Sequence, residues 1–172
     1  MPVIAEVLLV GVVVVVGLVL ITLTLGLVED VDSPAPVVSE TSGVVAPTTD
    51  GQTIEITHVA GDTVRLSNVE IVVDATAACG RQARIVDLPL DGERYLHPDN
   101  VTGAAILSTA NRSAADYDPG ALLAERFAAG ETIGLRLADS CSLSPGDEVT
   151  VTVVHRPRAS IVSRTTVVVP GS

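Results

Sequence analysis

Hydrophobic and polar residues follow two different patterns along the chain, one before residue 29 and another after residue 51. Residues 7–28 are uncharged and mostly apolar, and Glu29 ends the run. At about 1.5 Å per residue a helix of this length reaches roughly 33 Å, which is enough to cross a bilayer. The many valines suit a strand, but soluble strands do not run to this length, so the pattern predicts a helix. A cleaved secretory signal is disfavoured, because no basic segment precedes the run and no A-x-A-like site ends it.

From Gln52 onward the pattern changes to period two, with turn signals between short apolar runs. About seven short strands at this spacing predict an antiparallel β-sandwich. In 132–138 we expect the odd-numbered apolar residues to point inward and Gly134 and Arg136 to point outward. The clearest strand candidates are 53–59, 69–75, 82–88, 132–138, 148–155 and 160–169.

Two segments break this pattern. Residues 31–51 are rich in Pro, Ser, Thr and Gly, which predicts an extended linker or a leading edge strand and not a packed element. Residues 119–128 could hold one short helix, with Asp118 as its cap and Pro119 at its first position. We therefore expect three parts: a hydrophobic helix at 1–28, a linker at 29–51 and a β-sandwich head domain at 52–172.

The charge balance is strongly acidic, with a formal net charge of −11 and a pI of about 4.4. Every basic side chain apart from histidine is an arginine. High salt screens the self-repulsion of such a chain, so the composition favours a halophilic source, while a GC-rich genome is the alternative. Nucleic acid is not an expected partner, because the sequence has no basic patch to neutralise phosphates.

The only two cysteines are Cys79 and Cys141, and neither belongs to a CxxC pair. The apolar N-terminal run suggests a location outside the cytoplasm, where one disulfide between them is the natural interpretation. Two buried free thiols are the alternative.

The sequence shows little that could support catalysis. His58, His97 and His155 are far apart, and no nucleophile elbow, phosphate-binding loop or zinc-protease motif is present. We therefore expect no enzyme activity, no metal and no cofactor. Asn100 and Asn111 each begin an N-glycosylation sequon, and both are candidate glycan acceptors in an exported protein.

Glu6 and the glycines of the N-terminal run distinguish it from a simple anchor. Small residues at Gly11, Gly17 and Gly26 would allow identical helices to approach closely. Glu6, near the helix start, is favoured by the helix dipole and could pair with the α-amino group of a neighbouring chain. The alternative is that Glu6 lies among lipid headgroups and is hydrated.

The run PVIAEVLLVGVVVVVG resembles the start of mature archaeal type IV pilins, particularly those of halophilic archaea. Segments 56–64, 127–133 and 143–155 resemble parts of the β-rich pilin head more loosely. The resemblance implies an α+β fold in the lollipop arrangement, a long N-terminal hydrophobic helix followed by an antiparallel Ig-like β-sandwich head. Glu6 lies four residues after Pro2, the spacing at which many such pilins place an assembly glutamate.

The resemblance also implies a structural role. Such a chain would be processed by a prepilin peptidase, wait in the cytoplasmic membrane, and be assembled by pilus machinery into an extracellular filament of identical subunits. Pilins of this kind serve in surface adhesion and biofilm formation. A membrane-anchored binding domain that does not polymerise and an archaellin-like subunit are the alternatives.

Overall fold

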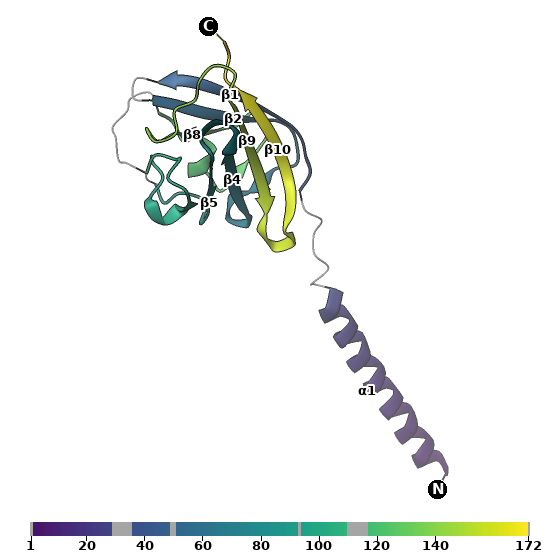
Figure 1. Ribbon diagram of the computed structural model, residues 1–172. Coiled ribbons are helices and arrows are strands. Elements are labelled where there is room, and N and C mark those ends of the chain that lie inside the picture. The colour runs from purple at the N-terminus through teal and green to yellow at the C-terminus, as the bar shows by residue number, and fades with distance from the viewer. Residues whose placement is uncertain (1, 29–35, 49–50, 93, 110–116, 172) are drawn as a thin grey trace. The chain divides into compact units, whose positions relative to one another are not determined.

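The computed structural model describes residues 2–28, 36–48, 51–92, 94–109 and 117–171. The chain divides into two compact units, Met1–Pro34 and Ala35–Ser172. The first unit contains one helix, α1 (Pro2–Val28), which is drawn in purple in Figure 1. The second unit, called the β unit below, contains all the described strands.

The β unit is built from antiparallel pairs. One sheet has the order β1-β2-β8, a second β10-β9-β4-β5-β6, and a small third sheet pairs β3 with β7. The strands are β1 (Val38–Thr48), β2 (Gly51–Gly61), β3 (Val64–Arg65), β4 (Val69–Ala75), β5 (Arg81–Ile85), β6 (Val101–Gly103), β7 (Arg126–Phe127), β8 (Thr132–Arg136), β9 (Glu148–His155) and β10 (Ser160–Val168). Short helical turns connect them: η1 (Leu66–Asn68), α2 (Thr76–Cys79), η2 (Pro98–Asn100), η3 (Ala121–Leu123) and η4 (Arg156–Arg158).

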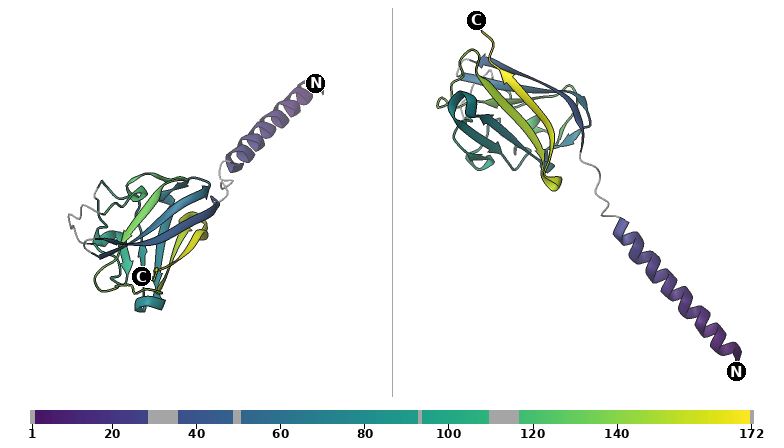
Figure 2. Two further views of the ribbon diagram at one scale, coloured as in Figure 1. Left: turned by 90° about the horizontal axis from the view of Figure 1, so that it is seen from above. Right: turned by 45° about the vertical axis from the view of Figure 1, so that its right-hand side comes forward.

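The core lies between the two larger sheets, which face each other in both views of Figure 2. Alternation along the strands produces it: β4 buries Val69, Ile71, Val73 and Ala75, and its even-numbered residues are half-buried. Small aliphatic residues supply most of the buried volume, and Phe127 is the only phenylalanine in it. Strands β1 and β10 approach each other across the two sheets, where the hydroxyls of Thr41 and Thr165 form a hydrogen bond.

The expected fold class is wrong. Strands account for 46% of the structure, the β unit has several sheets where one two-sheet sandwich was expected, and α1 is the only described helix with seven or more residues. The chain is therefore mostly β and does not have the expected α+β lollipop architecture. Among the residues whose side chains are described, no helix qualifies as a membrane span.

Of two local expectations, one fails and the other holds in part. Residues 119–128 form no α-helix, because the chain makes only the short turn η3 before it enters β7. The segment 31–51 contains β1, which is the edge strand of its sheet, as one of the two expected interpretations had it. The expectation that the segment is not packed is wrong, because β1 pairs along β2 and buries Val45. Hydrogen bonding to β2 compensates for the Pro and Gly residues that weaken β1 as an isolated strand.

Arg136 also departs from the period-two expectation, since it is only 3% exposed. Strand β8 is covered on both faces because Tyr117, from a distant part of the chain, packs there. The Arg136 guanidinium lies 5.4 Å from the centre of the Tyr117 ring, and the Tyr117 hydroxyl donates a hydrogen bond to Gly134 O. Burial raises the pKa of Tyr117 to about 12, although nearby Arg136 opposes that rise.

Candidate functional site

Apart from Glu6, the described side chains of helix α1 are apolar around the whole helix, a pattern typical of helices that are buried against other molecules or in a membrane. The valines and leucines of α1 whose side chains are described are more than half exposed, and Val7 reaches 68%. A water-exposed surface of this kind is unfavourable by roughly 25 cal/mol per Å² relative to a buried one. The helix surface is therefore the clearest candidate contact site for another molecule.

A shallow, open hollow of about 670 Å³ runs along one side of α1, and Gly11 lies in the middle of its lining. Apart from the residues next to it in the chain and the nearby helix backbone, no described atom lies within 4 Å of the position that a β-carbon on Gly11 would occupy. The hollow has room for an apolar side chain from outside. It is lined by Ile4, Val7, Leu8, Gly11, Val12, Val15 and Val16.

Glu6 and Gly17 lie on a different side of the helix from this hollow. At roughly 100° per residue they fall within about 20° of each other and about 120–140° away from Gly11. Glu6 is exposed, and Gly17 has open space around it. Pro2 and Gly26 belong to α1, but their surroundings lie outside the described side chains. Helix α1 thus offers two distinct faces, one with a hollow and one with a carboxylate.

In the β unit, Cys79 and Cys141 form a disulfide. Cys79 ends the short helix α2, which follows β4, and Cys141 lies in the turn region after β8. The bond therefore connects the five-stranded sheet to the segment that leaves the three-stranded sheet. Cys141 is almost completely buried.

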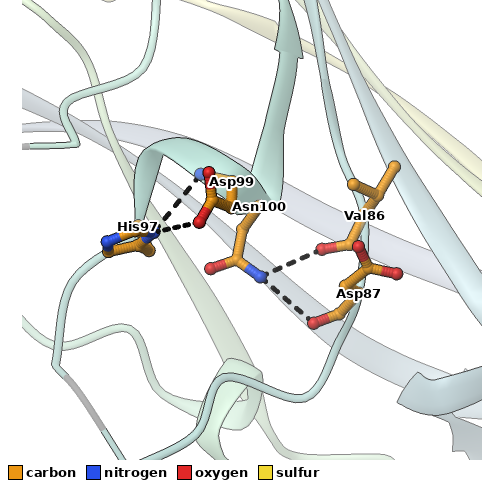
Figure 3. A network of polar contacts seen from close by, with 5 residues as sticks. All are labelled: Val86, Asp87, His97, Asp99 and Asn100. Atoms are coloured by element: carbon orange, nitrogen blue, oxygen red, sulfur yellow. Dashed lines mark hydrogen bonds and ion pairs between the residues drawn. The ribbon is translucent and has the colours of Figure 1, made fainter.

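Asn100, the first candidate glycan acceptor, holds two loop carbonyls in place (Figure 3). Its side-chain Nδ2 donates to Val86 O at 3.4 Å and to Asp87 O at 3.2 Å. Asp87 has a φ of 53°, a left-handed conformation that is costly for a residue other than glycine. The Asn100 amide therefore helps to hold a strained turn.

His97 and Asp99 complete this network. His97 Nδ1 lies 3.1 Å from an Asp99 carboxylate oxygen and 3.4 Å from the Asp99 backbone nitrogen. When Nδ1 carries a hydrogen it donates to the carboxylate, and when it carries none it accepts from the Asp99 N–H, so it makes one of these two hydrogen bonds at a time. An acidic hollow of about 330 Å³ lies beside them, lined by Asp87, Pro89, Leu90, Asp91, Tyr95, His97, Asp99 and Asn100.

A glycan on Asn100 would replace one of the two hydrogens on Nδ2, the atom that makes both loop contacts. This geometry disfavours modification of the folded chain at Asn100. Asn111, the second candidate acceptor, lies outside the described residues.

We expect Asn100→Ala to lower the free energy of unfolding by about 1–2 kcal/mol, because two loop carbonyls lose their donor. Thr102→Ala is the matched control, since it removes the same sequon but leaves the Asn100 amide in place, and Thr102 is exposed. Urea unfolding of both variants checks this. If both variants lose the same free energy of unfolding, a glycan stabilises the chain and the hydrogen bonds of the Asn100 amide do not.

The histidines do not come together. His58 and His155 are buried in different sheets, while His97 is on the surface. His58 packs against the Phe127 ring, with centroids 5.1 Å apart, which is a core contact. Within the described ranges, no group of three or more His, Cys, Asp or Glu side chains is placed to hold a metal ion.

Comparison with known proteins identifies no family for this chain. No protein-family model matches the chain, and no curated protein matches it. Its function is therefore argued from its own residues.

Proposed function

We propose that the chain is a structural, non-enzymatic subunit of an extracellular filament that polymerises through residues 2–28. The observation that carries the proposal is the exposed apolar surface of α1, which extends around the helix and is hollowed at Gly11. Copies of the same helix supply the apolar side chains that such a surface needs, and glycine permits close approach. Two distinct faces on one helix suit contacts with more than one neighbour.

Other features support an exported location. A disulfide persists in oxidising surroundings outside the cytoplasm. The acidic, lysine-free surface suits a halophile's cell exterior, where salt screens repulsion between neighbouring copies. Together with the resemblance of residues 2–17 to archaeal type IV pilins, these features support a pilus-like filament that serves attachment and biofilm formation. On this proposal the subunit meets a prepilin peptidase, the cytoplasmic membrane and pilus machinery before assembly.

Electron microscopy of material sheared from the native cells tests the proposal. We expect filaments that contain this chain, identified by mass spectrometry of the purified fraction. A chain found only as a detergent-bound monomer in the membrane fraction would overturn it.

Glu6 provides a test against the alternative of a non-polymerising membrane anchor. We expect Glu6→Leu to reduce filament yield by roughly five-fold, the factor that follows from losing about 1 kcal/mol per subunit contact. An anchor would tolerate the change, because leucine suits lipid better than a carboxylate does. Quantitative immunoblots of sheared and cell-bound fractions measure the effect, and Glu40→Leu, an exposed acid in β1, is the control. Unchanged filament yield would favour the anchor.

A further inference from the structure

Two arginines lie side by side on the surface of the β unit. Arg65 in β3 and Arg126 in β7 are directly opposite each other in the small antiparallel sheet, and both are exposed. Directly opposed side chains point to the same face, and like charges in that arrangement destabilise a sheet. In the part of the chain that the structure describes, neither arginine forms an ion pair, although the chain has 21 acidic residues. The pair is therefore available to an anion from outside.

The fold holds these side chains in place from below. Val64 and Phe127 are opposite each other in the same sheet and are almost fully buried, so their neighbours Arg65 and Arg126 must face outward. Leu66 N donates to Glu125 O at 3.0 Å, which extends the pairing beyond the two strands. The position of the arginine pair thus depends on a buried hydrophobic anchor.

A hollow of about 350 Å³ opens beside the pair, lined by Arg65, Ser67, Pro89, Glu125 and Arg126. A third arginine fixes its edge, because Arg156 donates from Nη2 to Ser67 O at 3.0 Å. The volume is at the lower end of the range for small-molecule sites. It accommodates a small molecule or one residue of a longer polymer.

The lining combines two cationic side chains with a carboxylate, a hydroxyl group and an apolar ring. A simple anion would need only the cationic side chains. Two guanidinium groups present planar arrays of donors suited to a carboxylate or sulfate. The Glu125 carboxylate is an acceptor and would repel a bare anion, but it can accept hydrogen bonds from hydroxyl groups. Ser67 adds a hydroxyl, and the Pro89 ring adds an apolar contact.

We propose that this hollow, the arginine pair site, binds an acidic saccharide, that is, a sugar residue carrying a carboxylate or sulfate. Arg65 and Arg126 hold the anionic group, Glu125 and Ser67 bind ring hydroxyls, and Pro89 contacts the C–H face of the ring. Nucleic acid fits poorly, because the site has no aromatic side chain for base stacking and the chain carries a net charge of −11. Such a site would let a surface protein attach to acidic polysaccharide, and it does not depend on polymerisation.

The test measures binding to the full chain kept unpolymerised in detergent micelles, by isothermal titration calorimetry at one fixed salt concentration. The probes are a glucuronate-containing hexasaccharide, a sulfated hexasaccharide, a neutral chitin hexasaccharide and inorganic sulfate. We expect one or both acidic saccharides to bind, which identifies the preferred anionic group, and the neutral one not to bind. No binding of either acidic saccharide would overturn the proposal, while the filament proposal would stand or fall on microscopy alone.

Matched variants separate a specific site from general charge attraction. Arg65→Gln and Arg126→Gln should each weaken saccharide binding at least ten-fold. Arg164→Gln is the control, because it removes the same charge from an exposed arginine on β10 and should change the affinity less than two-fold. If all three variants lose saccharide affinity to the same extent, the binding is general charge attraction and the proposed site is wrong. Weaker chain self-association without any change in saccharide affinity would assign the pair to contacts between copies instead.

A substitution at Glu125 distinguishes saccharide binding from the binding of a bare anion. Glu125→Gln should weaken saccharide binding several-fold, because an acceptor for hydroxyl groups is lost, and should strengthen or leave unchanged the binding of inorganic sulfate. If the variant strengthens both to the same extent, Glu125 acts only through its charge and the saccharide assignment is wrong.

Discussion

Replacing Gly11 with leucine should reduce filament yield more than ten-fold while the protein still reaches the cell envelope. The leucine side chain would fill the hollow between Val7 and Val15 and would keep a neighbouring helix at a distance. Leucine is also a strong helix former and suits lipid, so neither α1 nor the membrane-inserted state that the proposed function includes should suffer. The measurement compares the chain in sheared and cell-bound fractions by immunoblotting.

Gly11→Ala is the matched control, because alanine adds one methyl group and still permits close helix approach. We expect its filament yield to stay within about three-fold of the unmodified chain. A graded loss from alanine to leucine would identify the hollow as a packing surface. Normal assembly of the leucine variant would show that the Gly11 side of α1 is not a subunit contact.

Reducing the disulfide should lower the free energy of unfolding of the β unit by on the order of 4 kcal/mol, the loop-entropy value for its separation of 62 residues. For a unit of this size the thermal midpoint should fall by roughly 14 °C. Thermal unfolding of the full chain in detergent, with and without reductant, measures the change. Mass spectrometry after alkylation confirms that the bond has opened.

The double variant Cys79→Ala, Cys141→Ala controls for other effects of the reductant. Its midpoint should already be low and should not respond to reductant. If the unmodified chain keeps its midpoint after both thiols are shown to be free, the bond does not stabilise the fold.

Strands with uninterrupted alternation could be predicted from the sequence. The expected 69–75 and 148–155 coincide with β4 and β9, because every second residue in each is buried and, apart from His155, aliphatic. Strands β3 and β7 could not be found in this way, since two residues are too few to show a period. For the segment that contains β1, Pro and Gly residues predict a linker or an edge strand; β1 is the edge strand, and its packing depends on the pairing that β2 provides.

The candidate sites show the same limit. Gly11 and Glu6 stand out in the sequence because local spacing alone places them on one helix. Arg136 could not be predicted as buried, because the covering Tyr117 comes from a different part of the chain. The structural use of the Asn100 amide and the pairing of Arg65 with Arg126 also depend on contacts between distant segments. The hydrophobic period along a strand or helix indicates which face of that element is apolar. It does not indicate which distant segment packs on that face.

A helical reconstruction by cryo-electron microscopy of filaments sheared from native cells tests the central claim most directly. The account predicts a filament core in which residues 2–28 of neighbouring copies pack together, with apolar side chains of one copy entering the Gly11 hollow of another. A filament whose subunit contacts are made only by residues 35–172 would contradict it.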